Sequence, residues 1–185
     1  SISVDFDREL APFVDVSGPE STPDGDYNPL HGDYPSILGD QTIWWVMNDN
    51  GNIHTESGGM PIGIEIKCQA FGFSTNDEVN DMTFYNYELI NRGTQTLKET
   101  YFGQWVDPDL GNHNDDYVGC DVSRGLGYCI NGDSFDEGPY GYGSSPPAIG
   151  VDFFQGPYQD ADFIDNPLTT DVNTALAMGG IPYEG

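Results

Sequence analysis

Segments with strand character in this sequence are short, and turn residues separate them. In PIGIEIKCQAFGF (61–73), apolar residues alternate with glycine and polar residues, which is typical of a half-buried strand. QTIWWVMN (41–48) concentrates β-branched and aromatic residues, and it ends where Asn50-Gly51 suits a hairpin turn with positive φ. Both segments favour a protein built from sheets.

Further strands are predicted along the rest of the chain. MTFYNYELIN (82–91) and QTLKETYFGQWV (95–106) are expected to pair as a hairpin through the turn between them. LGYCIN (126–131) and AIGVDFF (148–154) are shorter strands, and only NPLTTDVNTALAMGG (166–180) permits a helix. We therefore predict an all-β fold, an antiparallel β-sandwich or jelly-roll-like arrangement with long acidic loops and little helix.

The N-terminal part of the chain differs in composition from the rest. Residues 1–40 are rich in Asp, Gly, Pro and Ser and are expected to form an extended acidic arm packed on a β-sandwich domain of residues 41–185. At 185 residues, the two parts most simply form one structural unit. The chain begins SISVDF, with neither a signal peptide nor an initiator Met, so we expect a fragment of a longer protein. No stretch approaches the ~18 apolar residues of a membrane span.

The charge balance restricts the possible partners. The chain has 31 acidic residues against five Lys and Arg, which gives a formal net charge of -26. Such a negative field repels nucleic acid and anionic membranes, and it opposes the compact state unless cations bind or screen it. Divalent cations are therefore the favoured partners, although a solvated acidic surface would also explain most single carboxylates.

One acidic stretch is a strong candidate for a metal site. In DPDLGNHNDD (107–116), two carboxylates alternate after a predicted strand, Gly111 permits a sharp bend, and further oxygens return toward the same point. Calcium takes six to eight oxygen ligands and tolerates loose geometry, so Ca²⁺ is the predicted ion, with a solvated acidic turn as the alternative. The candidate ligands are Asp107, Asp109, Asn112, Asn114, Asp115 and Asp116.

Two other acidic segments have related spacing. DGDYNPLHGD (24–33) offers a second calcium site, to which Asp15 would contribute, and YQDADFIDNP (158–167) offers a third. The candidate ligands of the second site are Asp24, Asp26, Asn28 and Asp33, and those of the third are Asp160, Asp162 and Asp165.

No motif in the chain indicates an enzyme. The three histidines lack HExxH or HxH spacing, no serine lies in GxSxG, and the many carboxylates do not single out a glycosidase pair. Cys120 and Cys129 are candidates for a disulfide or for free thiols, with Cys68 as a buried thiol. Tyr140 and Tyr142, flanked by glycine and proline in GPYGYGSS, are the candidate ligand-binding residues because exposed aromatic rings can stack on sugars.

Five long segments carry a family resemblance: GDYPSILGDQTIWWVMND, GNIHTESGGMPIGIEI, NDMTFYNYELINRG, FGQWVDPDLGNHNDDYVGCDVSRGLGYCINGD and PPAIGVDFFQGP. Together they resemble a β-rich module of large secreted or surface proteins of Bacteroidota, many of them type IX secretion cargo. The resemblance implies an extracellular segment of a longer polypeptide and brings no catalytic residues. It also implies a calcium-type N-terminal loop, from which this chain departs by extra residues between Asp15 and Asp24.

These features predict a non-enzymatic, calcium-stabilised module of an extracellular or cell-surface protein, with an adhesive or structural role. A carbohydrate-binding module attached to a secreted enzyme and a subunit of an extracellular fibre are the alternatives. The expected partners are cell-surface glycans or neighbouring copies or domains of the same protein.

Overall fold

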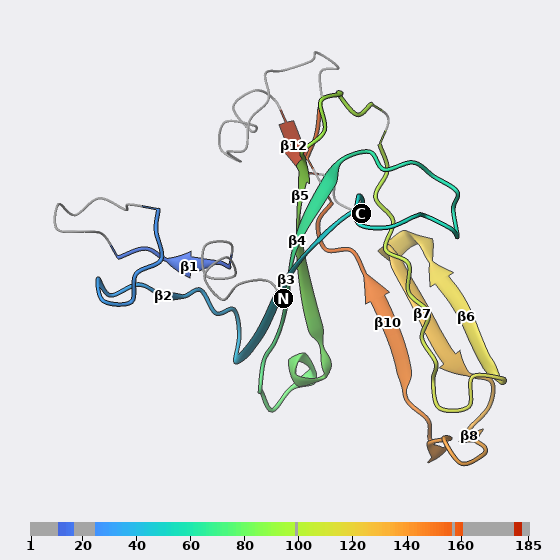
Figure 1. Ribbon diagram of the computed structural model, residues 1–185. Helices are drawn as coiled ribbons and strands as arrows, with labels where there is room; N and C mark the ends of the chain where they lie inside the picture. The colour runs from blue at the N-terminus through green and yellow to red at the C-terminus, as the bar shows by residue number, and fades with distance from the viewer. Residues whose placement is uncertain (1–10, 17–24, 99, 157, 161–179, 183–185) are drawn as a thin grey trace. The chain divides into compact units, whose positions relative to one another are not determined.

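The chain divides into two compact units, Ser1–Thr100 and Tyr101–Gly185. The boundary between the two units falls within residues 41–185, the range predicted to form one β-sandwich domain. That the whole chain forms one structural unit stays a prediction. The computed structural model describes residues 11–16, 25–98, 100–156, 158–160 and 180–182 (Figure 1).

A three-stranded antiparallel sheet forms the centre of the first unit, in the order β3-β4-β5 (Figure 1). Its strands are β3 (Gln41–Asn48), β4 (Ile64–Gly72) and β5 (Thr83–Asn91). The prediction of β3 is confirmed at both ends, and those of β4 and β5 are confirmed with slightly shorter bounds. β4 is the middle strand, and it carries the buried residues Ile64, Cys68 and Ala70.

The register of this sheet explains the alternating pattern of β4. Cys68 lies opposite Trp45 of β3 and Tyr87 of β5, so a large ring flanks the small thiol on each side. Burial raises the pKa of the Cys68 thiol. On the other face, Lys67 pairs with Glu88 at 3.5 Å. The sheet therefore has an apolar face and a more polar face, as the alternation predicts.

Two turn predictions in this unit are wrong. Neither Asn50 nor Gly51 has a positive φ, and a long connection joins β3 to β4 in place of a two-residue turn. The segment 95–106 does not pair with β5, because β5 is an edge strand of its sheet and no described residue of 95–106 lies in a strand.

The turn after β5 shows why that hairpin does not form. Asn91 Oδ1 accepts a hydrogen bond from the Gly93 N–H at 2.9 Å, and Asn91 Nδ2 donates to the Gln95 carbonyl at 3.0 Å. The Arg92 N–H donates to the Gly63 carbonyl at 2.8 Å. These bonds hold the turn against the residue that precedes β4, so the chain leaves the sheet after β5.

The second unit contains another three-stranded antiparallel sheet, in the order β10-β7-β6 (Figure 1). β7 (Leu126–Asn131) confirms its prediction, and β10 (Ala148–Asp152) ends two residues earlier than expected. β6 (Asp116–Asp121) was not predicted, because it begins inside the stretch interpreted as an acidic loop. The 3-10 turn η2 (Val122–Arg124) and Gly125, with φ of 66°, connect β6 to β7.

Two tyrosine rings cover glycines of the β6–β7 hairpin. Gly119 lies opposite Tyr128 in the ladder, and a Cβ atom on Gly119 would lie 2.5 Å from Tyr128 Cζ. A Cβ atom on Gly132 would lie 2.7 Å from Tyr117 Cε2. Only glycine leaves space for the rings at these two positions.

All three cysteines are free thiols. In the β6–β7 ladder, Cys120 lies opposite Gly127 and Cys129 lies opposite Val118, so the two cysteines are diagonal neighbours. Diagonal Cβ atoms are separated by up to about 7 Å, whereas a disulfide requires about 4 Å. The structure thus favours free thiols over the disulfide that the sequence left open.

The all-β class and the antiparallel pairing are confirmed, and no described residue lies in an α-helix. The face-to-face packing of a sandwich or jelly roll stays a prediction. The helix expected at 166–180 lies outside the described residues except for Gly180, which is in a strand. Among the described residues, no helix is long and apolar enough to cross a membrane. The remaining elements are the pairs β1 (Phe13–Val14) with β2 (Tyr34–Pro35), β8 (Phe135–Asp136) with β9 (Gly143–Ser144) and β11 (Tyr158–Asp160) with β12 (Gly180–Pro182), and the 3-10 turn η1 (Glu78–Asp81).

Candidate functional site

The acidic stretch 107–116 folds around carboxylates of its own unit. Asp116, the first residue of β6, accepts a hydrogen bond from the Leu110 N–H through Oδ2 at 2.9 Å. Leu110 is buried, with only 1% of its surface exposed. The loop is therefore closed onto the start of β6 by one carboxylate and one apolar side chain.

A second carboxylate, Asp136 of β8, holds the same loop. It is 2% exposed and accepts N–H bonds from Asn112 at 3.1 Å and from Tyr142 at 2.8 Å, one on each oxygen. Gly111, with φ of 67°, packs against this carboxylate so closely that a Cβ atom would overlap Asp136 Oδ2. The bend expected at Gly111 is confirmed, and Asp136 is the residue against which it forms.

Three buried oxygens at one end of the β6–β7 hairpin have no hydrogen-bond partner among the described residues: Asp115 Oδ1, Asp116 Oδ1 and Asn131 Oδ1. Asp116 and Asn131 lie opposite each other in the ladder, so their side chains share one face of the hairpin. The Gly132 N–H donates to the Asp115 carbonyl at 2.8 Å, which holds Asp115 next to the same rung.

The amide of Asn131 is fixed in its orientation. The residue is 8% exposed, and its Nδ2 lies 3.3 Å from the Asp133 carbonyl and 3.4 Å from the Phe135 carbonyl, to which it donates. Exchanging Nδ2 and Oδ1 would place an acceptor against two carbonyl oxygens. Asn131 Oδ1 therefore stays a buried acceptor near a carboxylate, and buried acceptors without donors cost free energy.

The other predicted ligands of this site lie in different surroundings. Asp107 and Asp109 are exposed, and the strand expected before them is absent from the described residues of 95–106. Asn112 is half-buried, and Asn114 is exposed and donates from Nδ2 to Asn112 Oδ1 at 2.9 Å. Thus Asp115 and Asp116 belong to the buried end of the hairpin, and the other four do not share its orphaned oxygens.

Carboxylates alone do not form a metal centre here. Within the described residues, no group of three or more His, Cys, Asp or Glu side chains is arranged to hold a metal ion. A cation at the hairpin end would require amide, carbonyl or water oxygens besides the two aspartates. Calcium accepts all of these ligands.

A hollow of about 230 Å³ is lined by residues 111–114 of the loop and by residues 137–140. Tyr140 lines it together with Asn112, Asn114 and Glu137, so one predicted ligand-binding tyrosine meets two predicted metal ligands. Tyr142 does not line the hollow, and its main-chain N–H binds Asp136. The exposed fractions of Tyr140 and Tyr142 are 84% and 60%.

The second predicted calcium loop is organised by Asp33. This buried carboxylate accepts N–H bonds from Asn28 at 2.7 Å and Val16 at 2.9 Å, and these bonds lower its pKa. Asp15 Oδ2 accepts from the Gly25 N–H at 2.8 Å, so Asp15 does reach the loop. Asp26 is exposed but has an interaction partner, and Asp24 lies outside the described residues, as do Asp162 and Asp165 of the third segment.

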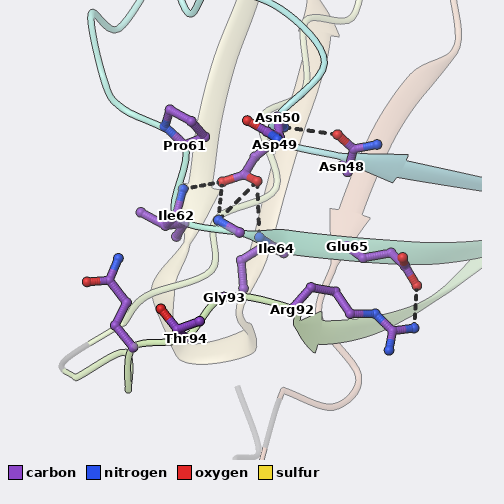
Figure 2. A pocket seen from close by; sticks show the side chains of 12 residues that line it. Asn48, Asp49, Asn50, Pro61, Ile62, Ile64, Glu65, Arg92, Gly93 and Thr94 are labelled. Atoms are coloured by element: carbon purple, nitrogen blue, oxygen red, sulfur yellow. Dashed lines mark hydrogen bonds and ion pairs between the residues drawn. The ribbon is translucent and has the colours of Figure 1, made fainter.

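Asp49, which directly follows β3, is the corresponding carboxylate in the sheet of the first unit (Figure 2). Its oxygens accept hydrogen bonds from the consecutive N–H groups of Ile62, Gly63 and Ile64. The Ile62 bond is the largest cause of the lowered pKa of Asp49. Asp49 lines an open pocket of about 540 Å³, and Figure 2 shows the ion pair of Arg92 and Glu65, 2.9 Å apart, in the same pocket.

Asn131, Asp136 and Asp49 are structural centres that the local sequence patterns do not predict. Asn131 and Asp136 lie in CINGDSFDEG, where oxygen-bearing residues follow a strand directly, which is the same signal that identified 107–116. Asp49 follows its strand in the same way in VMNDNG. Their partners are main-chain groups or residues distant in sequence, which the local pattern does not specify.

No family model matches this chain, and no curated protein or solved structure matches it.

Proposed function

We propose that this protein is a non-enzymatic, calcium-stabilised module of an extracellular or cell-surface protein, with an adhesive or structural role. The observation that supports it is the set of buried, partnerless oxygens of Asp115, Asp116 and Asn131. A divalent cation would supply the positive charge that these acceptors lack, and calcium suits a mixture of carboxylate, amide and main-chain oxygens.

The proposed role of calcium is thermodynamic. An ion that binds the folded hairpin and not the unfolded chain stabilises the fold by about 2.7 kcal/mol when its concentration is 100 times Kd. Calcium sites of extracellular modules have Kd values of about 10⁻⁴ to 10⁻³ M, so they fill only where calcium is abundant. We therefore propose an extracellular location, which a calcium site of this affinity and the resemblance to secreted proteins would support.

Thermal unfolding with calcium and with EDTA tests the proposal. We expect calcium at 100 times Kd to raise Tm by roughly 10–20 °C, since ~1 kcal/mol shifts Tm of a small domain by ~4–8 °C. Magnesium at the same concentration is the control for general screening of the charge of -26, because Mg²⁺ requires stricter octahedral geometry.

A matched pair of variants locates the effect. Asp116→Asn removes one charge at the hairpin end and should abolish most of the calcium-induced shift. Asp152→Asn removes the same charge from an exposed position at the end of β10 and should leave the shift intact. Two results would contradict the proposal: a Tm that is equal in calcium and in EDTA, or a calcium-induced shift that the two variants reduce equally. Either would show that water or ordinary charge screening satisfies these oxygens.

A further inference from the structure

Tyr140 is presented on a tight turn. The Gly141 N–H donates to the Gly138 carbonyl at 3.3 Å, Gly138 has φ of 91°, and a Cβ atom on Gly141 would lie 2.5 Å from the Glu137 carbonyl oxygen. The turn thus requires glycine two residues before and one residue after Tyr140, while the tyrosine ring itself is 84% exposed. The backbone that carries the ring is therefore already ordered, so a ligand that stacks on Tyr140 does not have to order the turn.

The wall of the hollow near Tyr140 carries paired donors and acceptors. The bond from Asn114 Nδ2 to Asn112 Oδ1 leaves Asn112 Nδ2 and Asn114 Oδ1 without a partner among the described residues. Glu137 lines the same hollow, is exposed, and has no ion-pair or side-chain hydrogen-bond partner in the described part of the chain. The hollow thus offers one amide donor, one amide acceptor and one carboxylate beside the Tyr140 ring. This set matches the neighbouring hydroxyl groups of a sugar ring, each of which can donate and accept a hydrogen bond.

Size and charge limit the ligand further. At about 230 Å³, the hollow is smaller than the ~300–1,000 Å³ clefts that enclose drug-sized ligands, so it suits one ring and not a buried chain. The net charge of -26 and the carboxylate of Glu137 disfavour sulfated or uronic acid sugars.

From these observations we infer that the hollow beside Tyr140 binds one uncharged pyranose ring of a glycan. The ring stacks on Tyr140, and its hydroxyl groups bind Asn112, Asn114 and Glu137. This inference rests on the adhesive form of the proposed function and supplies its ligand class.

The hollow is connected to the proposed calcium site through the backbone. The Asp115 N–H donates to the Asn112 carbonyl at 3.4 Å, and Asp136 binds the N–H of Asn112 and that of Tyr142. An ion that fixes Asp115 therefore also restricts the wall that carries Asn112. Calcium should increase sugar affinity, and by reciprocity the sugar should increase calcium affinity by the same factor.

Saturation-transfer NMR with the methyl glycosides of glucose, galactose, mannose and N-acetylglucosamine, and with glucuronic acid, tests the inference. We expect transfer to at least one neutral glycoside in calcium and none to glucuronic acid. Tyr140→Ala should lower the affinity at least tenfold. Tyr101→Ala, which removes a tyrosine that is 91% exposed and does not line the hollow, should not change it.

The outcomes separate this inference from the calcium proposal. Binding to none of the neutral glycosides, or equal binding by the two tyrosine variants, would overturn the sugar site even if calcium raises Tm. Binding that persists unchanged in EDTA, together with a calcium-independent Tm, would retain the sugar site and refute the calcium proposal.

Discussion

Asp49, which follows β3 in the first unit, and Asp116, which begins β6 in the second, are both half-buried, but their oxygens have different partners. Both oxygens of Asp49 receive main-chain N–H groups, because Ile62, Gly63 and Ile64 present three donors in succession. Asp116 receives one N–H, from Leu110, and its other oxygen lies buried near Asn131 without a donor. The first carboxylate is satisfied by the chain itself, and the second is not.

The difference originates in the N–H groups of the backbone that lies next to each aspartate. Gly63, with φ of 82°, allows successive N–H groups to point to one side, and Gly93 packs too closely to admit a Cβ atom at Gly63. At the hairpin end, the regular β6–β7 ladder uses the nearby N–H groups, so few remain for the side chains. A site that lacks protein donors is where an external cation contributes most.

The largest expected effect comes from removing Asp136. Asp136→Ala leaves the N–H groups of Asn112 and Tyr142 without their acceptor, and it should lower the free energy of unfolding by about 2–5 kcal/mol. Urea denaturation would measure the loss, with the exposed Asp152→Ala as control. A loss no larger than that of the control would mean that the acidic loop does not depend on this carboxylate.

The second largest expected effect is a difference between the two units in how calcium changes their hydrogen exchange. Hydrogen exchange of the β6–β7 hairpin should slow by roughly 100-fold at calcium 100 times Kd, while exchange of Ile62, Gly63 and Ile64 should stay unchanged. Uniform slowing of both units would indicate charge screening and would remove the distinction between them.

Asn131→Asp sharpens this test, because its effect on stability should depend on whether calcium is present. A second carboxylate opposite Asp116 should destabilise the calcium-free hairpin by repulsion, and it should enlarge the calcium-induced rise in Tm above that of the unchanged protein. A smaller calcium response in this variant would argue against an ion at this rung.

Acid should affect the first unit through Asp49. Its folded-state pKa is lowered below the ordinary value of 3.8 by the N–H of Ile62, so its contribution to stability is complete above that value and disappears as pH falls through the folded pKa. Asp49→Asn should therefore be less stable than the unchanged protein at pH 6, and the difference should narrow below pH 3.8. Unfolding monitored by fluorescence across this range measures it, and a difference that is constant with pH would contradict it.

The smallest effect is expected for the ion pair of Arg92 and Glu65 in Figure 2. Both side chains reach solvent, and such pairs contribute little to stability and weaken with salt. Arg92→Met should change Tm far less than Asp49→Ala does. A comparable loss from the two variants would mean that the ion pair, and not the N–H groups around Asp49, holds this turn.

The sequence predicts the strands of both units well where side-chain alternation and β-branched residues coincide, as in β3, β4 and β7. It fails at β6, because aspartate at a strand end has the same local appearance as aspartate in a loop. It also fails at the supposed hairpin after β5, because the side-chain bonds of Asn91 and the contact of Arg92 with Gly63 decide the path of the chain. Of the candidate site, the local sequence predicts Asp115 and Asp116. Asn131 joins it only through pairing across the ladder, and Asp136 only through hydrogen bonds to distant N–H groups.

The tyrosine rings over Gly119 and Gly132 have a consequence for assembly of the hairpin. A shift of the ladder by one residue would exchange the two faces of β6 and move each ring away from the glycine that accommodates it. The two glycines therefore select a single alignment of the strands during folding. The pairing of Asp116 with Asn131 depends on that alignment, so a substitution at Gly119, three rungs away, would disturb ion binding at the hairpin end.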